Sequence, residues 1–193
     1  MTSTVISQRV LPRSAVVSVL LVVGAAGLTA LAAQWEIHLA FTPVPITGQT
    51  FAVLLTGAAL GSRLGAAGQT LYVAAGAAGL PVYAGGAAGW DQAQAVGTTG
   101  YLIGFIVAAG LVGYMAERRQ DRTFPTMFTA FILGSFVIYG FGVTGLILTF
   151  GMSLVEAIVA GVVPFLLGDL IKAACAGLLL PGAWKLVGEH PRA

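Results

Sequence analysis

Two residues of opposite charge, Asp169 and Lys172, lie inside the hydrophobic run 164–181, and no other hydrophobic run holds two ionisable groups well inside its ends. A charge within hydrocarbon costs roughly 3 kcal/mol or more, so an intramembrane charge usually marks a functional site. Three positions apart on a helix, the two side chains share a face and can neutralise each other. The carboxylate accepts hydrogen bonds and the ammonium donates them, which suits a neutral polar ligand with N–H and C=O groups. The alternative is an ion pair that only fixes helix packing.

The composition is that of an integral membrane protein. Of 193 residues, 58% are hydrophobic and 8% are charged, whereas about one-quarter of a soluble domain is charged. The mean hydropathy is +0.93. Several long apolar segments exclude a signal peptide ahead of a soluble body. The single cysteine, Cys175, rules out an internal disulfide and a cysteine-based zinc cluster. We expect an all-α membrane protein that forms one domain over residues 1–193.

The apolar runs predict six transmembrane helices. The second run is short of the roughly 20 residues that a full span needs, so it either begins near Pro45 or crosses only part of the membrane. The sixth leaves room for an interfacial segment before Pro164. The predicted helices lie at 15–34, 50–61, 64–81, 100–116, within 124–150 and within 153–186.

The cations give this topology an orientation. Six spans put both termini on one side, and the connections on the opposite side, 35–49, 82–99 and 151–155, contain no Lys or Arg. The positive-inside rule therefore predicts cytoplasmic termini, with tails 1–14 and 187–193, and places Asp169 nearer the outer end of its helix. Residues 118–122 are read as a surface anchor. The cations on the predicted cytoplasmic side are Arg9, Arg13, Arg63, Arg118, Arg119, Arg122, Lys185 and Arg192.

The outer connections carry the other candidate binding residues. In the segment 41–50, two prolines hold the backbone extended before a helix begins, so Thr47 and Gln49 are placed to hydrogen-bond a ligand. A plain loop is the alternative. The run 79–86 closes a helix, and its Tyr83 could stack on a ligand; a simple helix stop is the alternative. These connections concentrate Gln49, Tyr83, Gly85, Gly86, Trp90, Asp91, Thr98 and Thr99.

Small residues recur along the first predicted helix, where they let another helix approach closely. That second helix belongs either to this chain or to a separate subunit, and the spacing does not distinguish these possibilities. The small residues are Gly24, Ala26, Gly27, Ala30 and Ala33.

No catalytic motif is present. The chain lacks a Gly-x-x-x-x-Gly-Lys phosphate loop, a Gly-x-Ser-x-Gly elbow and a His-Glu-x-x-His helix. His38 and His190 are isolated, and Asp169 has no second intramembrane carboxylate nearby. We therefore expect neither an enzyme nor a metal site, and no cofactor or nucleic acid.

Four motifs follow one another along the chain: Pro43-Val-Pro-Ile-Thr-Gly-Gln-Thr50, Gly79-Leu-Pro-Val-Tyr-Ala-Gly-Gly86, Gly100-Tyr-Leu-Ile-Gly-Phe105 and Pro164-Phe-Leu-Leu-Gly-Asp-Leu-Ile-Lys172. In these motifs the sequence resembles the BioY family of biotin-specific substrate-capture components of energy-coupling-factor transporters, over roughly residues 20–185. One departure is Gly97-Thr-Thr-Gly-Tyr101, where the family usually reads Pro-Thr-Gly-Gly-Tyr.

This resemblance implies a six-helix protein of the bacterial cytoplasmic membrane that binds biotin from outside. It also implies two cytoplasmic ATPases and a transmembrane coupling subunit, which the small residues of the first helix would face. By resemblance, Asp169 and Lys172 hold the biotin head group, and Tyr101 belongs to a pocket loop. Biotin's ureido ring offers two N–H donors for the carboxylate and one C=O for the ammonium; alternatively, Lys172 faces the biotin carboxylate.

Three other functions fit the same residues. The chain could be a capture component for another vitamin, such as thiamin or riboflavin. It could be a self-sufficient ion-coupled carrier in which Asp169 carries a proton and Lys172 modulates it. It could also be an assembly factor without a ligand, in which the ion pair is structural.

Overall fold

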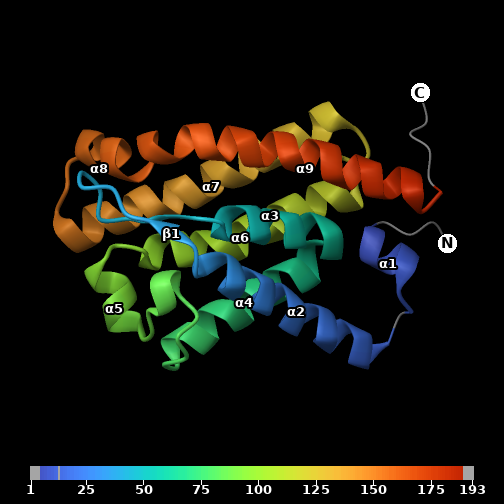
Figure 1. The fold of residues 1–193 in the computed structure, drawn as a ribbon, viewed down its shortest axis with the longest axis horizontal. Helices are drawn as coiled ribbons and strands as arrows, with labels where there is room; N and C mark the ends of the chain where they lie inside the picture. The colour runs from blue at the N-terminus through green and yellow to red at the C-terminus, as the bar shows by residue number, and fades with distance from the viewer. Residues whose placement is uncertain (1–4, 13, 189–193) are drawn as a thin grey trace.

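A computed structural model describes residues 5–12 and 14–188, which form an elongated helical bundle (Figure 1). Arg13, His190, Arg192 and the ends of both predicted tails lie outside the described residues. The elements are α1 (Ile6–Val10), α2 (Ala15–Ala33), β1 (Glu36–Ile37), β2 (Ile46–Thr47), α3 (Gln49–Leu60), α4 (Ser62–Ala77), η1 (Ala84–Gly86), α5 (Trp90–Ala95), α6 (Thr99–Glu117), α7 (Phe124–Phe150), α8 (Leu154–Gly161), η2 (Val163–Phe165) and α9 (Leu166–Leu186).

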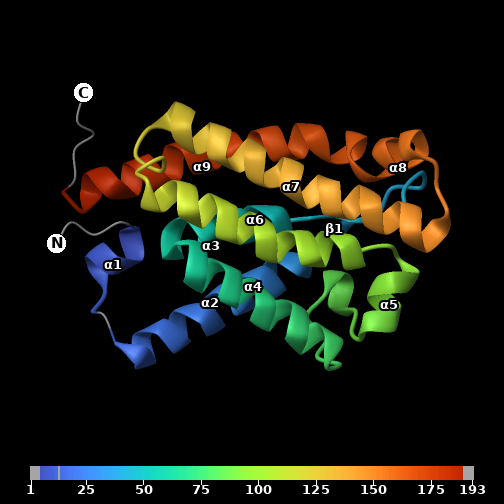
Figure 2. The ribbon, with the colours of Figure 1, turned by 180° about the vertical axis from the view of Figure 1, so that it is seen from behind.

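The bundle has three layers, with α6 and α3 in the middle. Helix α6 packs against α7, α3 and α4, while α9 packs on α7 and α2 packs on α4 and α3. Figures 1 and 2 both show α7 and α9 on one side of the middle layer and α2 and α4 on the other. Among the four longest apolar segments of the described chain, α6 is the most buried. The core is therefore built around α6.

Within the part of the chain that the structure describes, four helical segments are long and apolar enough to cross a membrane: Ala15–Ala33, Thr99–Glu117, Phe124–Phe150 and Leu154–Leu186. The other two predicted spans are shorter: α3 has 12 residues and α4 has 16. At 1.5 Å per residue these reach about 18 and 24 Å, less than the roughly 30 Å hydrocarbon core. Helix α3 lies inside the bundle, and most of its residues are buried. Non-helical backbone at either end of such a short helix is tolerated in a membrane protein where surrounding protein encloses it. The six-span topology stays a prediction.

The two ends of the bundle differ in character. At the end that we call the hairpin end lie β1, β2, η1, α5 and α8, and at the arginine end lie α1, the turn 118–123 and the C-terminal end of α9 (Figure 1). The two strands pair antiparallel, Glu36 with Thr47 and Ile37 with Ile46, a hairpin that the sequence did not predict. The elements at the arginine end carry Arg9 on α1, Arg118, Arg119 and Arg122 in the turn, and Lys185 in the last turn of α9. Arg63 follows Ser62, whose hydroxyl donates to Glu117 at the end of α6.

Helix α4 ends at Ala77, four residues before the predicted Pro81. Gly79 adopts a φ of 98°, and the N–H groups of Gly79 and Leu80 donate to the carbonyls of Gly76 and Ala75. A glycine in this conformation just past a helix satisfies its last carbonyls and stops it. The predicted helix-closing role of the 79–86 run is confirmed, but the stop comes earlier.

At the arginine end, a buried cluster joins the turn after α6 to α9. The carboxylate of Asp121 accepts hydrogen bonds from Trp184 Nε1 at 2.5 Å and from Arg122 Nε at 3.0 Å, and the Arg122 guanidinium lies 3.1 Å from the Trp184 ring centroid. Burial raises the pKa of Asp121, while Trp184 and Arg122 oppose that rise. Arg122, which was read as part of a surface anchor, is instead buried.

Helices α3, α4 and α6 meet through glycines. A Cβ on Gly57 would lie 2.5 Å from the Ala109 carbonyl oxygen, and one on Gly65 would lie 2.8 Å from the Gly57 Cα. We predict that Gly57→Ala lowers the free energy of unfolding by about 1–3 kcal/mol, because the helix backbones must move apart.

The measurement is the apparent melting temperature in detergent, with Gly140→Ala as the matched control. Gly140 lies within α7, and no atom comes within 4 Å of its added Cβ. Because alanine favours helix over glycine by up to about 1 kcal/mol, the control is expected to be at least as stable as the parent. Equal melting temperatures for the two variants would contradict close packing at Gly57.

Candidate functional site

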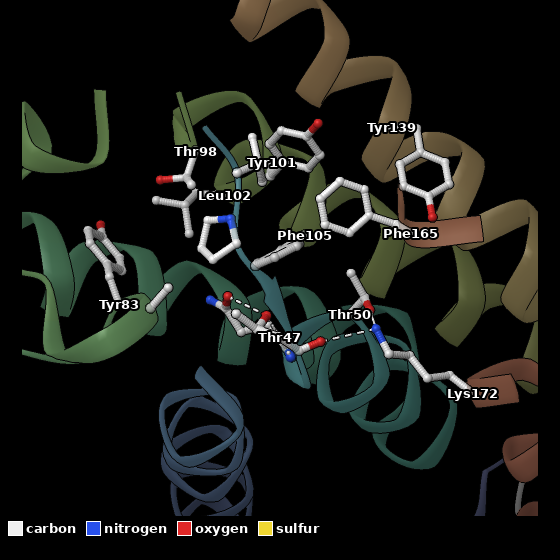
Figure 3. A pocket seen from close by; sticks show the side chains of 14 residues that line it. Thr47, Thr50, Tyr83, Thr98, Tyr101, Leu102, Phe105, Tyr139, Phe165 and Lys172 are labelled. Atoms are coloured by element: carbon white, nitrogen blue, oxygen red, sulfur yellow. Dashed lines mark hydrogen bonds between the residues drawn. The ribbon is translucent and has the colours of Figure 1, made fainter. Parts of the chain in front are cut away.

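A cavity lies between α3, α6, α7 and α9, near the hairpin end (Figure 3). The cavity has a volume of about 50 Å³, which is room for a few water molecules. A bicyclic ligand therefore requires the lining side chains to move apart. The lining residues are Val44, Pro45, Thr47, Gln49, Thr50, Tyr83, Ala84, Thr98, Tyr101, Leu102, Phe105, Tyr139, Phe165 and Lys172.

The Lys172 ammonium forms the polar wall of this cavity. It donates to Asp169 Oδ1 at 2.9 Å, to Thr50 Oγ1 at 2.6 Å and to the Thr47 carbonyl at 3.1 Å. The ammonium has three hydrogens, so these three acceptors match it fully. Lys172 thus fastens the start of α3 to α9, as the view in Figure 3 shows for Thr47 and Thr50.

Asp169 lies behind this wall and is only 4% exposed. Its Oδ1 accepts from Lys172 and from Thr50 Oγ1, the latter at 3.2 Å, and its Oδ2 accepts from the Tyr139 hydroxyl at 2.5 Å. Donors on both oxygens and an adjacent ammonium offset the large penalty of burying a carboxylate. Asp169 is not among the cavity-lining residues, but its three partners all are.

Gln49, the first residue of α3, contributes a second polar group to the cavity lining. Its Oε1 accepts from Thr47 Oγ1 at 2.8 Å, and its Nε2 donates to the Tyr72 hydroxyl at 2.6 Å. The rings of Tyr72 and Tyr83 meet edge to face, 5.7 Å apart, and the Tyr83 hydroxyl donates to the Val73 carbonyl. Burial raises the pKa of Tyr83 above its ordinary value.

A break in the last membrane segment brings an aromatic side chain to the cavity. The chain leaves helical geometry at Val162, and η2 then places Phe165 beside Tyr101, with ring centroids 6.5 Å apart. The Tyr101 hydroxyl donates to the Gly161 carbonyl at 2.7 Å, which satisfies a group that the break frees. Broken helices of this kind form binding sites in many transporters.

A second hollow of about 240 Å³ lies beside the cavity and shares Pro45, Tyr83, Ala84 and Thr98 with it. Gly85 and Gly86 line this outer hollow and not the cavity. Gly85 has a φ of 60°, and a Cβ there would collide with the Glu36 carboxylate. The two glycines therefore shape the approach to the cavity from the hairpin end.

The structure thus gathers five of the eight predicted ligand residues on one cavity: Thr47, Gln49, Tyr83, Tyr101 and Lys172. Asp169 lies one layer behind, and the two glycines lie in the outer hollow. Phe105, Tyr139 and Phe165 also line the cavity but are not among the residues that the sequence predicts for the site. Phe105 lies four residues after Tyr101 on α6, a spacing that could have identified it. Tyr139 has no such signal within the apolar run of α7.

Comparison with known proteins agrees with the resemblance read from the motifs. The BioY family profile matches residues 4–189. A biotin transporter BioY of Rhizobium etli is 38% identical over 162 residues, covering 80% of this chain and 86% of that protein. One of Thermotoga maritima is 36% identical over 183 residues, covering 94% and 99%.

The fold is similar to a crystal structure described as the S-component for biotin from an ECF-type ABC transporter. The TM-score is 0.78 at 21% identity, over 90% of this chain and 95% of that one. BioY proteins are membrane transporters, so the expectation that the chain is not an enzyme is confirmed. The chain belongs to the BioY family.

Proposed function

We propose that this protein is the membrane subunit that captures biotin from the extracytoplasmic side for ATP-driven uptake. The observation that carries the proposal is the buried Asp169–Lys172 pair, whose ammonium faces a cavity with aromatic walls. The relatives named biotin transporters, which align with most of the chain, support biotin as the ligand.

The cavity chemistry suits biotin at both ends of the molecule. Lys172 offers a charge-assisted donor to the ureido carbonyl or to the carboxylate, and Gln49 offers an amide beside it. The rings of Tyr101, Phe105 and Phe165 supply the apolar cover that a bicyclic ring and an alkyl chain need. To give a hydrogen to the ligand, Lys172 must share or release one of its three protein acceptors.

In the proposed topology, residues 1–193 form one domain of six spans, with tails 1–14 and 187–193 in the cytoplasm of a bacterial cell. The gathering of cations at the arginine end supports this orientation. The hairpin end then faces outward, and the outer hollow becomes the approach to the cavity. Lipid covers the exposed apolar sides of the bundle.

The proposed partners are a transmembrane coupling subunit and two ATPases, which supply the energy. Small residues on α2 form the proposed contact, and the structure divides them by exposure. Gly24 and Gly27 are exposed, and no atom lies within 4 Å of an added Cβ at either position. Ala30 is half-buried, while Ala26 and Ala33 are buried within the chain. Gly24 and Gly27 are therefore the positions open to a partner helix.

We predict that biotin raises the apparent melting temperature of the detergent-solubilised protein, because a ligand that binds only the folded state stabilises it. Asp169→Asn is expected to weaken this stabilisation sharply while the protein level in the membrane persists, since the variant leaves the ammonium without its counter-charge. Asp91→Asn is the matched control, because Asp91 is exposed on α5 and lines neither the cavity nor the outer hollow. Stabilisation by thiamin or riboflavin in place of biotin, or unaltered biotin binding by Asp169→Asn, would contradict the proposal.

A second prediction concerns the coupling surface. Gly27→Leu is expected to keep biotin binding and to reduce ATP-driven biotin uptake at least tenfold in vesicles that contain the coupling module, because a large side chain blocks close helix approach. Gly140→Leu, on the exposed side of α7, is the control for a bulky residue facing lipid. If Gly27→Leu supports biotin uptake at the parent level, this face of α2 does not contact the coupling subunit.

A further inference from the structure

Tyr139 joins a third helix to the ion pair. Its hydroxyl donates to Asp169 Oδ2 at 2.5 Å, and its ring forms part of the cavity wall from α7. The side chain is only 6% exposed. Figure 3 shows the ring beside that of Phe165, on the opposite side of the cavity from Tyr83. Residues from α3, α7 and α9 therefore meet at one carboxylate.

The two oxygens of Asp169 are held from different directions. Oδ1 faces Lys172 and Thr50, while Oδ2 accepts from Tyr139. A hydrogen bond to a charged group contributes about 1.5–3 kcal/mol, and a buried acceptor that loses its donor becomes unfavourable. Without the Tyr139 hydroxyl, Oδ2 loses the donor that fixes its direction. The carboxylate is then free to rotate, and the Lys172 ammonium bound to Oδ1 is free to move with it.

We propose that Tyr139 is a positioning residue of the ligand site that acts through Asp169 on Lys172. Its hydroxyl has a single hydrogen, which it donates to Asp169 Oδ2, so it has no hydrogen left to donate to a ligand. Tyr139 fixes Oδ2 from α7, Thr50 fixes Oδ1 from α3, and the pair presents the ammonium in one orientation. This inference rests on the proposed function for the identity of the ligand, biotin.

The test is a double-mutant cycle on biotin affinity with the full-length protein in detergent. Tyr139→Phe keeps the ring and removes only the hydroxyl. We expect it to weaken biotin binding between about 10- and 100-fold. In the Asp169→Asn background the same change is expected to have less than a threefold effect, because the carboxylate through which Tyr139 acts is gone.

Tyr83→Phe serves as the comparison within the cavity, since its hydroxyl donates to Val73 and does not contact the pair. The fold-change in affinity caused by Tyr83→Phe is expected to be the same in the parent and in the Asp169→Asn background. If the fold-change caused by Tyr139→Phe is also the same in both backgrounds, or if Tyr139→Phe leaves the affinity within threefold of the parent, the positioning role is wrong.

If Asp169→Asn binds too weakly to measure, the decision rests on Tyr139→Phe and on the melting temperature without ligand. Because loss of this donor also lowers stability, Tyr139→Phe is compared with Gly57→Ala, which is expected to destabilise the bundle away from the cavity. A loss of affinity at least tenfold larger for Tyr139→Phe supports positioning, and an equal loss for the two variants overturns it in favour of a structural role. Failure of the parent protein to bind biotin would instead refute the proposed function.

Discussion

The arrangement of this protein depends on keeping one carboxylate and one ammonium inside an apolar bundle. Two charges removed from water are tolerated only when their attraction is supplemented by hydrogen bonds to the remaining donors and acceptors. Here Lys172 meets three acceptors and Asp169 meets three donors, from three different helices. The network therefore fixes α3, α7 and α9 relative to each other at the point where the cavity opens.

The rest of the fold makes room for that network. Helix α3 is short, and the strand β2 and Gly48 precede it, so the carbonyl of Thr47 is free to accept from Lys172 inside the bundle. The last membrane segment breaks at Val162, which turns Phe165 toward the cavity and leaves a carbonyl for Tyr101. Irregular backbone within a membrane protein survives where it is enclosed by protein or lines a cavity, and both irregular segments do so here.

Much of this arrangement could be predicted from the sequence, because hydrocarbon penalises polar groups strongly. Asp169 and Lys172 stand out as two charges within an apolar run, and the apolar runs themselves predict the long helices. Helix ends were predicted less well, as at α4, where hydrogen bonds around Gly79 stop the helix before the apolar run ends. The β1–β2 hairpin is too short to leave a pattern of alternation in the sequence.

The site was predicted in part for the same reason. Thr47 and Gln49 are found by their place before a helix, but Tyr139 lies within the 27-residue apolar helix α7, and only tertiary packing brings it to Asp169. The order of residues along the chain also does not show how far a side chain lies behind the cavity surface. Asp169 was expected to touch the ligand, whereas in the structure Thr50, Tyr139 and Lys172 stand between it and the cavity.

A density map of the protein with bound biotin tests the central claim most directly. The account predicts that the ligand occupies a widened cavity against Tyr101 and Phe165, with an oxygen within hydrogen-bond distance of Lys172 Nζ and with Asp169 still holding that ammonium. Biotin seated elsewhere, with Lys172 still bound to Thr47, Thr50 and Asp169 and no contact to the ligand, would contradict it.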